Sequence, residues 1–248
     1  MRRTHRPLRN AALLIAAILL LWQGLFAFAG RHALTPPLQT IGYLAALMHT
    51  GAFWGHVAET GTAFAVALVI AVAAGLAAGF LLGLNRTAAE VFEPLLLAAN
   101  SVPKIALYPV VLLIFGIGMP AKIAFGAIHG VVPVTIFTMG GLRNIRPVMF
   151  KTAAVLRLDR WATIRSVLVP AALPEIFTGL RIGFSLTLIG TLLGEMFGSQ
   201  RGLGFLLMTA IGLQNTRVIM AVTLLLVVFA ASISTALIVI DRRLHVRL

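Results

Sequence analysis

Residues 141–175 read GLRNIRPVMFKTAAVLRLDRWATIRSVLVPAALPE, a basic stretch set within a chain that is otherwise strongly apolar. Six Lys or Arg lie between Arg143 and Arg165. The segments on either side are long and apolar enough to cross a membrane. Loops rich in Lys and Arg stay on the cytoplasmic side. The stretch therefore predicts a cytoplasmic loop between two spans, where it can contact a soluble protein.

The composition is that of a membrane protein. Of 248 residues, 60% are hydrophobic and 11% are charged, with a mean hydropathy of +1.00, whereas soluble domains average about 25% charged residues. The chain has no cysteine, which excludes disulfides and thiolate metal sites. Its net charge of +13 lies mainly in loops and termini, which indicates membrane topology and not nucleic-acid binding. We expect an all-α protein with a single transmembrane domain over residues 1–248, with its core at about 55–245 and a coupling loop at 142–175.

Hydropathy predicts six membrane-spanning helices, each of about 20 residues. Their expected ranges are Ala11–Ala29, Thr62–Leu84, Pro94–Gly116, Ala121–Gly141, Ile176–Phe197 and Val218–Ile240. Fourteen Lys and Arg then lie on one side of the membrane and four on the other, with Lys104 and Arg181 inside spans. This bias predicts that both termini are cytoplasmic.

The N-terminal quarter allows two interpretations. Basic residues, an apolar run and a small-residue segment at 27–30 resemble a cleaved signal peptide, but the run over 11–29 is long enough to favour a retained span. After Pro36 and Pro37, apolar residues recur at helical spacing within 34–59. We expect an interfacial helix there on the outer face, with Trp54 at the level of the lipid headgroups.

Small residues recur every four positions in two of the expected spans. Such spacing places them on one helix face, where another helix can approach closely. We expect these glycines to pack helices within one bundle, with a dimer interface or a pore constriction as the alternative. They are Gly75, Gly79, Gly83, Gly190, Gly194 and Gly198.

Few ionisable residues fall at membrane depth, and such residues are functional candidates because they are costly there. Lys104 follows a proline, and two interpretations of it are about equally supported: an amine that faces a water-filled cavity, or a purely structural residue. The middle of the fourth span holds His129, which alternatively forms a hydrogen bond to a neighbouring carbonyl. Near the outer end of the fifth span, Glu195 alternatively contacts Arg201 or a helix N-terminus. We expect Lys104, His129 and Glu195 to be candidates for the solute pathway or its gate.

The sequence shows no motif for catalysis or nucleotide binding. It has no phosphate-binding G-x-x-x-x-G-K-[ST] motif, so it cannot bind ATP in that way. His49, His56 and Glu59 have irregular spacing, which favours a polar cluster over a metal site. We therefore expect no catalytic residue, no metal and no cofactor.

The basic loop is expected to hold two short helices. Pro147 suits the first position of a helix that runs to about Leu156. Asp159 suits the N-cap of a second helix over Arg160–Leu168, and Val169-Pro170 is expected to end it. A break near Arg157 keeps its charge out of an otherwise apolar stripe.

These features resemble the permease subunits of ABC importers, the membrane components of binding-protein-dependent transporters. Their loop motif is Glu-Ala-Ala, three residues, Gly, nine residues, an aliphatic residue, one residue, and Leu-Pro. Its positions fall here on Lys151, Thr152, Ala153, Arg157, Val167, Val169 and Pro170. Five further segments resemble the nitrate/sulfonate/taurine branch of this family. They are Pro103–Pro109, Phe115–Gly118, Pro170–Pro174, Thr178–Arg181 and Gly194–Gly204.

The loop departs from the family motif at several positions. Lys151 replaces the family Glu, Thr152 replaces an Ala, and Arg157 replaces the Gly. A left-handed conformation at Arg157 costs about 1–2 kcal/mol relative to glycine. Because the changes add positive charge, we expect an unusually acidic groove on the partner ATPase or an altered coupling.

The resemblance implies a six-span permease of a bacterial inner membrane that imports a small solute, such as a sulfonate, nitrate or a related organic anion. Its implied partners are a cytoplasmic ATP-binding subunit, a periplasmic or lipoprotein solute-binding protein, a second permease copy (a homodimer) and membrane lipid. The loop over 147–168 is expected to couple to the ATPase. Its coupling residues are then Lys151, Ala153, Leu156, Arg157, Asp159, Arg160, Trp161 and Ile164. A self-contained secondary transporter and an intramembrane enzyme are the alternative classes.

Overall fold

The computed structural model describes residues 5–30 and 33–245, and every regular element in these ranges is a helix. Five helices are long and apolar enough to cross a membrane, or six if one bent pair counts as a span. This confirms the expected all-α class. The helices are α1 (His5–Ala29), α2 (Pro37–Met48), α3 (Gly51–Gly83), α4 (Arg86–Ser101), η1 (Lys104–Leu107), α5 (Tyr108–Phe115), α6 (Met119–Arg143), α7 (Pro147–Val155), α8 (Arg160–Thr163), η2 (Ile164–Leu168), α9 (Val169–Gly198), α10 (Leu203–Gly212) and α11 (Thr216–His245).

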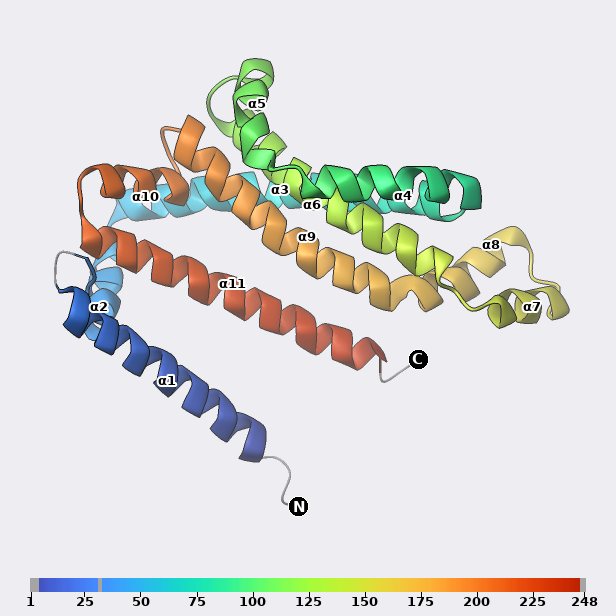
Figure 1. Cartoon of the computed structure of the whole chain (residues 1–248), viewed down its shortest axis with the longest axis horizontal. Coiled ribbons are helices and arrows are strands. Elements are labelled where there is room, and N and C mark those ends of the chain that lie inside the picture. Colours follow the sequence, from blue (N-terminus) through green and yellow to red (C-terminus); the bar gives the residue numbers. More distant parts are fainter. Residues whose placement is uncertain (1–4, 31–32, 246–248) are drawn as a thin grey trace.

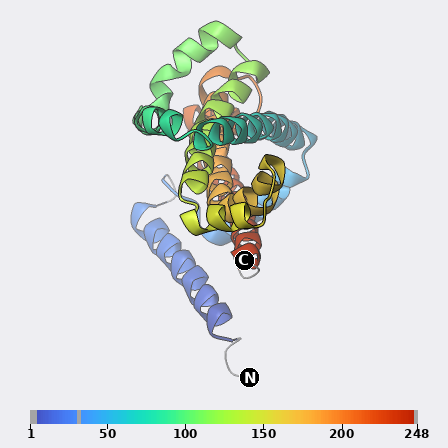
Figure 2. The same ribbon diagram turned by 90° about the vertical axis from the view of Figure 1, so that its right-hand side faces the viewer.

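The centre of the molecule is α6, which packs between α3 and α9 (Figures 1 and 2). Small residues permit this close approach. A Cβ atom added at Gly75 of α3 would lie 2.6 Å from Cβ of Val134, and one added at Gly190 of α9 would lie 2.8 Å from the ring of His129. The expected glycine ridges thus face α6 within one chain. Gly79, Gly83 and Gly194 face α6 in the same way, while Gly198 faces Tyr108 and Leu112.

The expected span over 94–116 is not one helix. α4 ends at Ser101, and η1 with α5 leaves it at an angle of 85°. Pro103 lacks a backbone N–H and forces the preceding residue out of the helical region; Val102 is extended, with φ −62° and ψ 131°. Hydropathy cannot detect this break, because apolar residues continue on both sides of it.

The interfacial helix is shorter than expected, and Trp54 does not belong to it. α2 ends at Met48, and Thr50 has extended backbone angles that separate it from α3. Trp54 lies in the first turn of α3, where its indole N–H donates to the Met48 carbonyl at 2.7 Å. The span predicted over Thr62–Leu84 corresponds to α3. Its helix begins eleven residues before Thr62, at Gly51, because residues 51–61 are also helical.

The second loop helix does not end at Val169-Pro170, and this expectation is wrong. The helix continues from Trp161 to Gly198. A π turn over Ile164–Leu168 makes this possible, because Val169 N–H bonds to Ile164 C=O, five residues back. Such a turn widens the helix locally, and Pro170 then occupies the start of α9, where a missing N–H is tolerated.

The two ends of the molecule differ. α7 and α8 project at one end, which we call the loop end, and α2 and α10 lie at the other, which we call the α10 end (Figure 1). α1 stands apart from the other long helices in both views (Figures 1 and 2), although Trp22 donates from its indole N–H to the Thr35 carbonyl at 3.0 Å.

Candidate functional site

The projecting loop holds two short helices joined by a hydrogen-bonded turn. After α7, Leu158 N–H bonds to Ala153 C=O at 3.1 Å and Arg157 N–H bonds to Ala154 C=O at 3.0 Å. Arg157 has φ +50°, the left-handed conformation in which the family has glycine. Asp159 then caps α8, because its Oδ1 accepts from Ala162 N–H at 2.6 Å. The chain thus reverses within three residues.

The tip of this loop exposes apolar side chains beside its basic residues. Leu156 is 63% exposed and Trp161 is 71% exposed, whereas Ala153 is buried. Lys151 is also exposed. Ile164 packs on the cluster of Leu142, Ile145, Leu168, Ala172 and Ile176, which ties the loop to α6 and α9. An exposed aromatic residue on a rigid support is typical of a protein-contacting surface.

The break between α4 and α5 carries Lys104. Its ammonium donates to the Asn100 carbonyl at 3.2 Å and lies 3.5 Å from Asn100 Oδ1. On α6, His129 is buried, and its Nδ1 donates to the Phe125 carbonyl at 2.8 Å, which is the alternative expected from the sequence. Tyr108, four residues after Lys104, packs edge-on against Phe125, and Phe125 packs against His129, so the turn that carries Lys104 lies beside this part of α6.

Glu195 lies elsewhere and is fully buried, within a polar cluster at the α10 end. Thr60 Oγ1 is 2.8 and 2.9 Å from its two carboxylate oxygens, and Gly204 N–H donates to it at 2.9 Å. The carboxylate therefore sits at the N-terminus of α10. Lys122 Nζ is 3.6 Å from Glu195 and 2.9 Å from Glu59.

Lys122 is the residue that sequence reasoning missed. The charge count places it among the four Lys and Arg on the outer side of the membrane, but it lies in α6 and has no exposed surface. Besides the two carboxylates, it donates to Ser199 Oγ and to the Arg201 carbonyl, both at 3.2 Å. The cluster of Glu59, Thr60, Lys122 and Glu195 thus joins α3, α6, α9 and the start of α10.

Two of the polar residues near the start of α3, His56 and Glu59, contact this cluster or the turn before α10. Glu59 pairs with Lys122, and His56 Nδ1 accepts from Gly202 N–H at 3.1 Å. In the described part of the chain, no group of three or more His, Cys, Asp or Glu is arranged to hold a metal ion.

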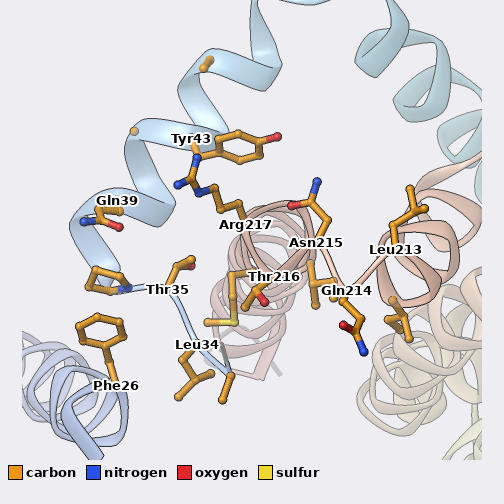
Figure 3. Close-up of a pocket in the computed structure, with 17 residues that line it drawn as sticks. Phe26, Leu34, Thr35, Gln39, Tyr43, Leu213, Gln214, Asn215, Thr216 and Arg217 are labelled. Atoms are coloured by element: carbon orange, nitrogen blue, oxygen red, sulfur yellow. The ribbon is translucent and has the colours of Figure 1, made fainter. Parts of the chain in front are cut away.

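A cavity of about 1370 Å³ opens at the α10 end, between the end of α1, α2 and the turn from α10 to α11. Figure 3 shows Arg217 beside the ring of Tyr43, with Phe26 on the α1 side of the cavity. Gln214 lines it with φ +54°. The wall is thus apolar toward α1 and polar toward α2 and α11.

Comparisons with known proteins identify the class. Residues 71–248 match the family described as binding-protein-dependent transport system inner membrane component, and the chain belongs to this family. It is therefore a multi-pass permease subunit of an ABC importer, in which ATP hydrolysis belongs to a separate subunit.

Individual relatives support this assignment. The chain is 30% identical to the taurine transport system permease protein TauC of Escherichia coli (strain K12) over 216 residues, covering 85% of this chain and 78% of TauC. It is 30% identical to the nitrate import permease protein NrtB of Leptolyngbya laminosa over 231 residues, covering 89% and 82%. It is 29% identical to the putative aliphatic sulfonates transport permease protein SsuC of Bacillus subtilis (strain 168), covering 84% and 76%.

A solved structure shares the fold. A chain of the MetNI methionine ABC transporter, in an inward-facing conformation, superposes with a TM-score of 0.66 at 22% identity, over 77% of this chain and 96% of that one. At this identity, the likeness establishes the fold alone. Family and fold together set aside the secondary-transporter and enzyme alternatives.

Proposed function

We propose that this permease imports a small anionic solute, of the class that includes sulfonates and nitrate. The observation that carries the proposal is the similarity to three permeases named for taurine, aliphatic sulfonates and nitrate. Lys104 supports it, because a lysine within a broken span favours an anion over a cation.

The proposed assembly contains two copies of this chain. Lys104 and Asn100 lie at the surface of a single chain and not in an enclosed channel. A second copy that faces this surface encloses a solute path between the two chains. Lys104 and Asn100 then line this path and are not exposed to lipid, where polar groups are costly. The homodimer is thus the simplest assembly in which one sequence supplies both walls.

The loop end is proposed to be cytoplasmic. From the α10 end, α1 and α11 both extend in the direction of the loop end, so the start of α1 and the end of α11 point away from the α10 end (Figure 1). The basic residues of 141–165 favour the cytoplasmic side. This orientation places both termini inside and directs Leu156 and Trp161 toward a cytoplasmic ATPase subunit. The α10 end then faces the solute-binding protein.

Reconstitution tests this function. The permease, its ATPase subunit and its solute-binding protein are placed in proteoliposomes, and uptake of labelled taurine, methanesulfonate and nitrate is measured with and without ATP. Taurine is a zwitterion that carries a sulfonate group, whereas methanesulfonate and nitrate are anions. The proposal predicts ATP-dependent uptake of at least one of these three solutes that requires the binding protein. ATP-dependent uptake of a solute without an oxyanion group, and of none of these three, would contradict it.

A further inference from the structure

We propose that Lys104 and Asn100 form an anion subsite at the break between α4 and η1, and that this subsite takes the oxyanion group of the solute. The inference rests on the proposed function, since it names the residues that would meet an anionic solute. It also places this subsite at the kink of a broken span, which the family assignment does not do.

The first observation is an uncompensated cation. Among the described residues, Lys104 Nζ donates hydrogen bonds only to the carbonyl and the side-chain oxygen of Asn100, both uncharged. The four ion pairs found among the described residues involve Arg86, Arg143 and Lys122, and none includes Lys104. A lysine at membrane depth is costly unless an anion or water accompanies it.

Helix capping does not account for the whole charge. Lys104 follows the C-terminus of α4, where the helix dipole is equivalent to about half a negative charge. The contact with the Asn100 carbonyl fits this role. The helix dipole is weaker than a full negative charge, and an ammonium has three N–H donors, of which the two Asn100 oxygens use at most two.

The second observation is depth. Tyr108, one turn after Lys104, packs edge-on against Phe125 with ring centroids 4.8 Å apart, and Phe125 packs against His129 at 4.6 Å. His129 is ten residues from the start of α6 and fourteen from its end, about 15 and 21 Å along the helix. Lys104 itself begins the second half of the bent pair Arg86–Ser101 and Lys104–Phe115, which places it in the interior of this broken span.

The third observation is the set of neighbouring donors. Asn100 is exposed, and its side-chain NH₂ has no hydrogen-bond partner among the described residues. No carboxylate lies on the 97–107 segment to repel an anion. An ammonium and an amide on adjacent helix turns supply N–H donors to a sulfonate, nitrate or bicarbonate oxygen, and charge-assisted bonds of this kind are the strong ones.

Labelling at the break tests the subsite without requiring transport. The chain has no cysteine, so Ser101→Cys introduces a single thiol beside Lys104 without background. Ser101 is exposed and only donates to the Leu97 carbonyl. The permease–ATPase complex in proteoliposomes is treated with an anionic and a cationic methanethiosulfonate reagent of similar size, in the S101C and the S101C/K104M backgrounds.

The subsite predicts that the anionic reagent reacts faster than the cationic one in S101C, and that K104M lowers this ratio at least about fivefold through loss of the local field. S101C/K104R keeps the ratio. Millimolar taurine or nitrate slows the anionic reaction in S101C. A thiol that neither reagent reaches, or a ratio that K104M leaves unchanged, overturns the subsite.

Transport separates this inference from the proposed function. If the wild type shows ATP-dependent anion uptake and K104M retains more than half of it at low solute concentration, the subsite is wrong while the function stands. If the wild type takes up only solutes without an oxyanion group, the function fails whatever the labelling shows. The subsite itself predicts a rise of at least about tenfold in KM for K104M and a partial rescue by K104R.

Discussion

Thr60 and Glu195 are 135 residues apart in sequence, yet the Thr60 hydroxyl lies within 3 Å of both carboxylate oxygens of Glu195. The same hydroxyl accepts from Leu203 N–H at 2.7 Å. A single threonine thus ties α3 to α9 and to the start of α10. With Lys122, it forms a buried polar cluster that holds one end of the bundle together.

Removing the cation of this cluster is expected to be strongly destabilising. Lys122→Met leaves Glu195 buried without its positive partner, and breaking a buried pair costs about 3–5 kcal/mol. Adding Glu195→Gln removes the stranded charge, so the double variant is expected to lose less than the sum of the single ones. The free energy of unfolding in detergent measures this, with Arg201→Ala as control because that side chain is exposed. Additive single effects would contradict a coupled cluster.

Close packing of α3 on α6 makes a second prediction. Gly75→Ala places a Cβ 2.6 Å from Cβ of Val134, and overpacking of this kind costs about 1–3 kcal/mol. Gly140→Ala is the matched control, because a Cβ there meets no atom within 4 Å. We expect the control to be neutral or slightly stabilising, since alanine favours helices by about 1 kcal/mol. Equal unfolding midpoints for the two variants would show that α3 and α6 pack differently.

The turn of the loop stores backbone strain at one residue. Arg157 has φ +50°, so Arg157→Gly is expected to stabilise the loop by about 1–2 kcal/mol. Arg157→Ala is the control, because it removes the same charge but keeps the left-handed conformation unfavourable. Hydrogen exchange of the amides over 153–163 measures the effect. If these amides exchange equally slowly in the Gly and Ala variants, any gain in loop stability comes from the lost charge and not from the backbone conformation.

The basic character of the loop predicts an acidic groove on the ATPase subunit. Restoring the family residues in Lys151→Glu/Arg157→Gly reverses one charge and removes another, so affinity for the native ATPase is expected to fall at least about tenfold. The affinity of the wild type should also fall more steeply with salt than that of the variant. Tighter binding of the variant to the native ATPase would contradict the acidic groove.

Sequence reasoning succeeded where the signal was local. The break between the two loop helices follows from Asp159 as a cap and from the charge of Arg157, which one continuous helix would place in an apolar stripe, and both residues lie at the turn. The membrane class follows from composition, which tertiary contacts cannot change. The glycine ridges indicated a close approach, although they did not indicate that α6 would be the helix approached.

The buried cluster lay beyond this reasoning because its members come from three distant segments. A signal was nevertheless present. Continuing the four-residue ridge of α3 backward from Gly75 through Ala67 leads to Glu59, and the ridge of α6 through Gly130 and Gly126 leads back to Lys122. Two ridges of small residues that each end in a charge of opposite sign predict an ion pair at the end of the packed helices.

The helix through Pro170 was missed for a different reason. Proline rules describe regular α-helices, and here a π turn shifts the hydrogen-bond pattern just before the proline. The 85° break at Val102 is the converse case, in which a proline does end a helix within an apolar run. The same residue type therefore has opposite outcomes, and the choice depends on packing that one sequence does not display.

The central claim is that the exposed tip of the α7–α8 loop holds the ATPase subunit. Co-purification of the ATPase with the tagged permease tests it most directly, in the wild type, in Leu156→Ser/Trp161→Ala and in Leu213→Ser. Leu213 is the matched control, because it is 74% exposed at the opposite end of the molecule. The ATPase is predicted to accompany the wild type and Leu213→Ser and to be lost from the double variant. Retention of the ATPase by the double variant, or its absence from the wild type, would contradict the claim.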